Sequence, residues 1–230
     1  MSDGFAPVNT DPFTPEARHI AVVAGGLGDP SSTRLLADRL TEAATAALSQ
    51  EGIVPEVHVI ELRELATAIS DALVTHNNSP ALADAIDQVE QADGIITTAP
   101  TFKATYSGLF KSFWDLVDDQ GIVNVPVLLG ATGGTSRHSL MIDNAMRPLF
   151  GYLKAKTIPT AVFAASDDWG EVVGAAESSR TSPLQSRILD AGEDFASVVA
   201  RLKPRPRRSR GEPKPLEVVS FKNLLRGPGS

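Results

Sequence analysis

AVVAGGLGDPSSTR, residues 21–34 of the 230-residue chain, is the stretch that decides the fold. It completes an apolar run over residues 19–24, which is too short for a helix and is typical of a strand buried on both faces of a parallel sheet. Gly25, Gly26 and Gly28 permit a tight turn and let an anion approach the main chain. The stretch therefore predicts a strand, a phosphate-binding loop and the start of a helix.

The start of the helix after this loop is also suited to bind a phosphate. Ser31 or Ser32 is suited to cap it, and Leu35, Leu36 and Leu40 are expected to share its apolar face. Free N–H groups and the positive end of the helix dipole converge on the loop, so we expect a phosphate there. The side chains expected to assist are Ser31, Ser32, Thr33 and Arg34. The alternative is an ordinary capped helix after a glycine turn.

Composition limits the class of protein. A chain of 230 residues with 42% hydrophobic content suffices for one α/β domain with extensions. It has no cysteine, which excludes disulfides, thiolate nucleophiles and thiolate metal sites, and we expect no metal. No signal-peptide pattern opens the chain, and no apolar run approaches the ~20 residues of a membrane span. We therefore expect a cytoplasmic protein that does not contact a membrane.

Charge divides the chain unevenly. Residues 203–230 carry eight Lys or Arg and two Glu, a net charge of +6, and subtracting this from the overall −7 leaves −13 for the rest. An acidic body argues against nucleic acid as a partner. We expect a flexible arm over residues 1–18 and one domain over 19–202. A basic, extended linker at 203–210 then leads to an apolar segment at 218–226, which either docks or stays mobile.

Strands alternate with helices along the domain. The strands are expected at residues 19–24, 54–60, 94–99, 125–130 and 157–163. Pro55 suits the second of them to a sheet edge, where His58 would be solvated. Pro148 should kink the helix that reaches residue 153 or begin a new segment. The pattern predicts an α/β fold, a doubly wound five-stranded parallel sheet of order 2-1-3-4-5 with helices on both faces.

Three unusual loops follow the first, third and fourth strands. In this strand order they lie side by side at the carboxyl ends of the strands, where doubly wound sheets bind ligands. The second and third loops are rich in small residues and exposed N–H groups, which suit a flat heterocycle with carbonyl and ring-nitrogen acceptors. A flavin fits this description.

Three motifs resemble those of the flavodoxin-like, NAD(P)H-dependent FMN reductases, in particular the members that supply reduced flavin to two-component monooxygenases. The motifs are SSTR at residues 31–34, APTFKATYSGLFK at 99–111 and ATGGTSRH at 131–138. The resemblance covers about residues 19–165, and the second motif is its most specific part.

The resemblance implies an FMN site. It implies that Ser31, Ser32, Thr33 and Arg34 hold the phosphate, and that Pro100, Thr101, Phe102 and Lys103 line the ring, with Tyr106 and Ser107 nearby. Thr132, Gly133, Gly134 and Ser136 would border the other side of the ring. The physical reading agrees, because N–H dipoles with Lys103 or Arg137 near would stabilise the negative charge of a reduced flavin.

Hydride transfer needs no acid or base from the protein, because the nicotinamide and the flavin supply the chemistry. Arg137 and His138 are candidates for contact with NAD(P)H, against a role in helix capping. We favour NADPH over NADH as the donor. The resemblance also implies a homodimer or homotetramer and a flavin-dependent monooxygenase as partner, although quinone or azo-dye reduction by the same flavin is an alternative.

Two other interpretations of the sequence compete with that of an FMN reductase. Ser139, Tyr152 and Lys156 have the spacing of short-chain dehydrogenases, but the glycine pattern and the acidic residue of a dinucleotide fingerprint are missing, and the Tyr and Lys straddle a predicted helix end. A flavodoxin-like electron carrier or flavin-binding module is the alternative of another class. Small loops that leave one flavin face open for a nicotinamide argue against it.

Overall fold

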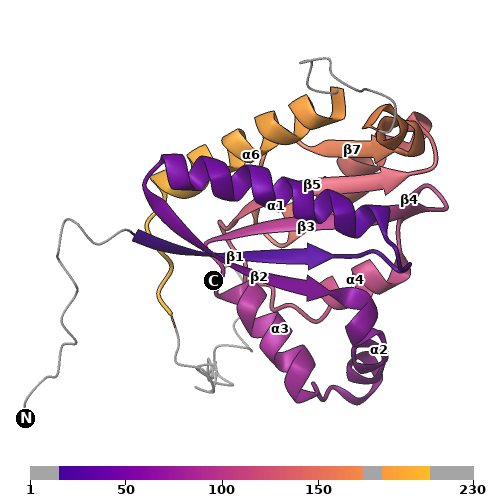
Figure 1. Ribbon diagram of the computed structural model, residues 1–230. Helices are drawn as coiled ribbons and strands as arrows, with labels where there is room; N and C mark the ends of the chain where they lie inside the picture. Colours follow the sequence, from indigo (N-terminus) through magenta and orange to yellow (C-terminus); the bar gives the residue numbers. More distant parts are fainter. Residues whose placement is uncertain (1–15, 173–182, 208–230) are drawn as a thin grey trace, which may run out of the picture.

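The computed structural model describes residues 16–172 and 183–207, which contain one seven-stranded sheet. The central order is β2-β1-β3-β5-β6, with β7 also paired to β5 and β4 to β3 (Figure 1). All pairs are parallel except the short β3–β4 hairpin. The strands are β1 (Glu16–Ala24), β2 (Ile53–Glu61), β3 (Gly94–Phe102), β4 (Thr105–Tyr106), β5 (Pro126–Gly133), β6 (Lys156–Thr157) and β7 (Val162–Ala165).

This topology confirms the predicted doubly wound sheet of order 2-1-3-4-5, with β2 at the edge. The predicted fifth strand is split into β6 and β7, both of which pair with β5. Ile158 still donates its N–H to the carbonyl of Val127, after which the pairing with β5 is interrupted until β7. β1 begins at Glu16, earlier than predicted, and β4 was not predicted.

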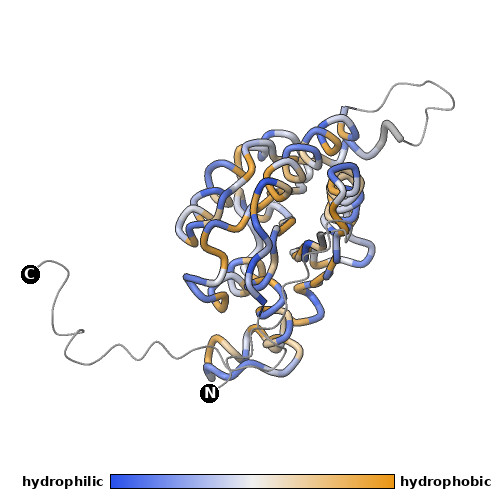
Figure 2. Tube along the Cα trace, turned by 90° about the vertical axis from the view of Figure 1, so that its left-hand side faces the viewer, coloured by the Kyte–Doolittle hydropathy of each residue, from blue (hydrophilic) through white to orange (hydrophobic). Residues whose placement is uncertain are grey.

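Helices cover both faces of the sheet (Figure 1). α1 (Ser32–Gln50) and α6 (Pro183–Arg201) share one hydrophobic core with the sheet, and the helices α2 (Ala66–Thr75), α3 (Pro80–Glu90), α4 (Gly108–Trp114) and α5 (Arg147–Tyr152) share the other. Shorter helical turns are η1 (Leu62–Leu65), η2 (Ser136–His138) and η4 (Ser166–Val172), with a π-helix at Ile142–Met146. Hydropathy alternates along the chain, as expected of elements with one buried face (Figure 2). No helix in the described ranges combines the length and apolar character needed to cross a membrane.

Two details of the helices differ from or refine the predictions. Leu36 and Leu40 are fully buried, but Leu35 is 42% exposed, because successive helical residues point about 100° apart. The aromatic residues Phe110 and Trp114 of α4 are buried core residues. Pro148 lies in the first turn of α5, where the π-helix Ile142–Met146 passes directly into the α-helix, so the geometry of the helix changes beside the predicted proline position.

The first part of the predicted basic linker is attached to the body. The Arg205 N–H donates to Asp93 Oδ1 (2.6 Å), and its guanidinium donates to the carbonyls of Glu90 (2.7 Å) and Gly121 (2.9 Å). Arg207 donates to Asp93 Oδ2 (2.6 Å). Residues 203–207 have no regular secondary structure, which is compatible with an extended linker, and a buried carboxylate and backbone carbonyls hold Arg205 and Arg207 against the body. Of the predicted arm over residues 1–18, residues 16–18 belong to β1 and residues 1–15 lie outside the described residues, as does the tail from 208 with its segment 218–226.

Candidate active site

The loop after β1 brings the start of α1 into the predicted position. Ser31 has extended backbone angles, and its hydroxyl accepts the N–H of Arg34 (3.2 Å), so Ser31 caps the helix. Helix geometry leaves the other first-turn N–H groups without intrahelical partners. The positive end of the α1 dipole therefore faces the carboxyl end of β1.

Three buried threonines hold this helix start against the sheet. The hydroxyls of Thr33 and Thr132 form a hydrogen bond of 2.7 Å between α1 and β5, and the Thr98 hydroxyl donates to the Thr33 carbonyl (3.1 Å) from β3. All three residues are buried. Hydrogen bonds in such a buried network fix the position of α1 relative to both strands.

The Arg34 side chain, which was predicted to help hold the phosphate, is bonded to two carboxylates. Its guanidinium donates to Asp38 (2.8 Å) and forms an ion pair with Glu61 at the end of β2. The hydrogen bond with Asp38 is the largest influence that raises the pKa of Arg34, so the side chain is charged. Arg34 is engaged with these carboxylates and is not among the residues that line the cavity described next.

A cavity of about 970 Å³ lies beyond the carboxyl ends of β1, β3 and β5. This is the edge at which a doubly wound sheet binds ligands. Three loops with the adjoining strand ends, the helix α1 and the turn η4 supply its walls. The lining residues are Leu27, Gly28, Pro30, Ser31, Ser32, Thr33, Leu35, Arg39, Pro100, Thr101, Phe102, Thr132, Gly133, Gly134, Ser166 and Trp169.

Most of the predicted site residues meet at this cavity, and the rest lie elsewhere. Those outside the lining are Arg34, Lys103, Tyr106, Ser107, Ser136, Arg137 and His138. Ser107 is buried as the cap of α4, where its hydroxyl accepts the Phe110 N–H (3.3 Å). Tyr106 packs against Phe110, with ring centroids 5.4 Å apart, and Lys103 sits exposed in the turn to β4. Arg137 and His138 are exposed on η2.

Sequence reasoning missed one wall of the cavity. Trp169 and Ser166 come from η4, which follows the last predicted strand, and Arg39 lies over the Trp169 ring, 5.4 Å from its centroid. Leu35, which was assigned to the core, lies here as well. A tryptophan in a polar stretch was the available signal, since loop aromatics often serve binding.

One polar atom at the cavity has no partner inside the protein. Within the described residues, the Thr101 hydroxyl oxygen is buried and forms no hydrogen bond. Buried hydroxyls are nearly always paired, so an unpaired one beside a cavity indicates a ligand or a water that bonds to it. Together with the capped helix start, it fits a polar, phosphate-bearing heterocycle.

The fold and this cavity define a flavodoxin-like flavoprotein. The sequence model of the NADPH-dependent FMN reductase family matches residues 18–170, and the chain belongs to this family. It is 38% identical over 181 residues to the NADH-dependent FMN reductase SfnF of Pseudomonas putida, a match that covers 78% of this chain and 93% of that protein. It is 36% identical over 190 residues to the FMN reductase (NADPH) of Pseudomonas aeruginosa, over 82% and 94% of the two chains.

Solved structures agree with this assignment. An oxidoreductase from Corynebacterium diphtheriae superimposes with a TM-score of 0.75 at 37% identity, over 82% of this chain and all of that one. The protein is thus an NAD(P)H:FMN oxidoreductase, an enzyme rather than an electron carrier. The dehydrogenase reading is also excluded by geometry, because Tyr152 ends α5 whereas Lys156 lies in β6.

Proposed function

We propose that the cavity beyond β1, β3 and β5 is where FMN binds and receives hydride from NAD(P)H, and that reduced FMN then passes to a separate monooxygenase. The main observation that supports this binding site is the unpaired Thr101 hydroxyl, which lies at a cavity that also exposes the capped start of α1. Bound FMN supplies the hydride-accepting chemistry. The residues of the protein bind it, orient it and leave one side open.

The phosphate end is assigned to the start of α1. The Ser31 hydroxyl accepts the cap hydrogen bond, so its own proton remains available to donate to a phosphate oxygen. Ser32 and the first-turn N–H groups add further donors beside the helix dipole. Because Arg34 is paired with Asp38 and Glu61, we assign the phosphate to hydroxyl and backbone donors without its guanidinium.

The ring end is assigned to the loops after β3 and β5. Thr101, at the end of β3, offers its hydroxyl, and Gly134, just beyond β5, leaves open space. A Cβ on Gly134 would meet no atom within 4 Å, which shows how open this wall is. Orientation by fixed donors is the protein's contribution to hydride transfer.

Replacing Thr101 with valine tests this site. Thr101→Val keeps the shape of the side chain but removes its hydroxyl, so we expect FMN to bind about tenfold more weakly. The unfolding free energy of the FMN-free protein should not fall, since the hydroxyl has no protein partner to lose. Quenching of FMN fluorescence measures the first quantity and urea denaturation the second.

The control for this variant is Thr105→Val, at an exposed threonine of β4 outside the cavity lining. Riboflavin, which lacks the phosphate, should bind wild-type protein more weakly than FMN does. Equal binding of riboflavin and FMN would argue against the phosphate assignment, and an unchanged FMN affinity of Thr101→Val would remove Thr101 from the site.

For the nucleotide donor we propose NADPH, with Arg137 and His138 as its contacts. Both side chains are exposed on η2, just after the cavity residue Gly134, so they are accessible to a second ligand. Relatives are named for both donors, SfnF for NADH and the Pseudomonas aeruginosa enzyme for NADPH. Arg137→Ala should raise the KM for NADPH and leave that for NADH unchanged; equal effects on both would contradict a 2′-phosphate contact.

Delivery to a partner monooxygenase requires that reduced FMN leave the protein. Anaerobic reduction followed by ultrafiltration tests this, since released FMN passes the membrane and retained FMN does not.

A homodimer or homotetramer stays a prediction, which light scattering in solution would check.

A further inference from the structure

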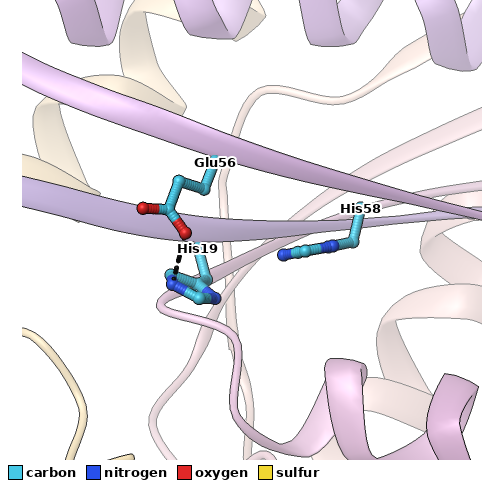
Figure 3. A group of neighbouring side chains, drawn as sticks. All are labelled: His19, Glu56 and His58. Carbon is cyan, nitrogen blue, oxygen red and sulfur yellow. Dashed lines mark ion pairs between the residues drawn. The ribbon is translucent and has the colours of Figure 1, made fainter.

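A cluster of two histidines and a glutamate lies on β1 and β2, away from the cavity. His19 on β1 is the direct neighbour of Glu56 on β2, and His58 lies two residues further along β2, opposite Ala21. Side chains two residues apart in a strand point to the same face. Figure 3 shows the three side chains gathered on that face, with the His58 ring extending toward His19.

The three side chains are close enough to share one ion. One ligand atom from each of His19, Glu56 and His58 lies within 4.8 Å of the other two. His19 Nε2 and Glu56 Oε2 are 2.7 Å apart, and the two imidazole rings are 5.4 Å apart at their centroids. Ligand atoms around tetrahedral zinc are roughly 3.4 Å apart, given bonds of about 2.0 to 2.1 Å, so small side-chain rotations would complete the site.

The surroundings of the cluster are polar and mainly acidic. A cavity of about 300 Å³ is bounded by both histidines and by Asp84, Asp87, Gln88, Gln91 and Arg207. Arg207 forms an ion pair of 2.6 Å with Asp93. Carboxylates and one guanidinium thus border the cluster, and the ligand atoms that could hold a cation come from the three clustered side chains.

We propose that His19, Glu56 and His58 bind a divalent transition-metal ion of the zinc type. Two imidazoles and one carboxylate are a donor set that suits Zn²⁺, Co²⁺ or Ni²⁺ better than Mg²⁺ or Ca²⁺, which prefer oxygen ligands alone. Three protein ligands leave a position for water, and the Glu56 side chain is half exposed, so an ion can enter from solvent.

The position of the cluster assigns it a role separate from flavin chemistry. His19 lies in the amino-terminal half of β1, whereas the flavin cavity begins beyond its carboxyl end at Ala24. A metal ion here would join the edge strand β2 to β1. Its binding to the folded state alone would therefore stabilise this edge of the sheet.

Titration of metal-free protein with Zn²⁺ tests the proposal. After removal of metals with EDTA and dialysis, calorimetry should show about one Zn²⁺ per chain, and Co²⁺ should give the visible absorption of a site with nitrogen ligands. Zn²⁺ should also raise the melting temperature of the wild-type protein. His58→Gln, which removes one ligand, should weaken Zn²⁺ binding roughly tenfold or more and abolish the shift.

The chain offers a matched control among its four histidines. His76 is exposed after α2 with φ of 58°, a conformation that asparagine also adopts, so His76→Asn should fold and bind Zn²⁺ like the wild type. Absence of saturable Zn²⁺ binding by the wild type would overturn the proposal. It would equally be overturned if His58→Gln and Glu56→Gln both bound Zn²⁺ as tightly as the wild type.

Discussion

At Gly26 the loop after β1 passes against the start of α1 with no room for a side chain. A Cβ built there would lie 2.1 Å from the Ser31 hydroxyl oxygen and 3.2 Å from the Thr33 Cβ. Ser31 could accommodate it only by rotating its hydroxyl away from the Arg34 N–H that it caps. The cap of α1 therefore depends on a glycine five residues before it.

Gly26→Ala should show this dependence. We expect the unfolding free energy to fall by about 1 kcal/mol through the lost cap, and FMN to bind roughly tenfold more weakly because the donors around Ser31 shift. Urea denaturation and fluorescence titration measure the two effects. Gly151→Ala is the control, since its added Cβ would meet nothing within 4 Å. Equal behaviour of the two variants would refute the argument.

The His19 imidazole makes stability depend on pH. Burial and the nearby charge of Arg207 lower the pKa of His19 below its ordinary 6.5, despite the opposite effect of Glu56. Below pH 6.5 the unfolded chain therefore binds more protons at this residue than the folded protein does, so its contribution to stability is present above pH 6.5 and is lost as the pH falls. In EDTA, the wild type should lose more stability than His19→Gln between pH 7.5 and 5.5. Parallel losses would contradict this assignment.

At the scale of elements, the contact between α1 and α6 depends on another glycine. A Cβ on Gly192 of α6 would lie 2.7 Å from the Ala43 Cβ and 2.8 Å from its carbonyl carbon in α1. These are close contacts with a short side chain and with backbone, so the helices would have to separate. The core around Leu40 and Phe195, which both helices share, would loosen.

Gly192→Ala should therefore destabilise the fold, by about 1–3 kcal/mol, as overpacked substitutions do. This exceeds the gain from the better helix propensity of alanine, which is about 0.5–1 kcal/mol. Urea denaturation measures the net change, and Gly151→Ala again serves as control, with stability unchanged or raised. A stabilised Gly192→Ala would show that α1 and α6 pack less closely than described.

At the scale of the whole molecule, Arg205 ties the chain after α6 to the opposite face of the sheet. Its guanidinium bonds to carbonyls of Glu90 and Ala92 at the end of α3 and of Gly121 beyond α4, while its N–H bonds to Asp93. Arg18 adds a bond from β1 to the Leu202 carbonyl (2.8 Å). Residues far apart in sequence thus meet at the amino ends of the strands.

Arg205→Ala should lower the unfolding free energy by about 1–3 kcal/mol, because several partly buried carbonyls lose a charged donor. FMN affinity should be unchanged, since the cavity that we propose binds FMN lies at the other ends of the strands. Lys203→Ala, at an exposed neighbour, should change neither quantity. A loss of FMN binding without a loss of stability would contradict this view of Arg205.

The order of strands, the capped start of α1 and the three loops at one sheet edge were predictable from sequence. The capped helix start and the loops follow from local chemistry, such as a short apolar run, a serine before a helix or glycines in a turn. The strand order follows from the alternation of strands and helices along the chain. Thr101 and Thr132 came within the predicted site through the family resemblance, and each lies two residues beyond the end of a predicted strand.

Only the tertiary structure decided which side chains reach the site and which are held elsewhere. Arg34 turns toward Glu61, a partner 27 residues away, and Trp169 completes the cavity from a stretch without periodicity. The pairing of His19 with Glu56 required the register of two strands separated by the whole of α1. Local sequence encodes backbone preferences, whereas the direction of a charged or aromatic side chain is set by the partners that folding brings to it.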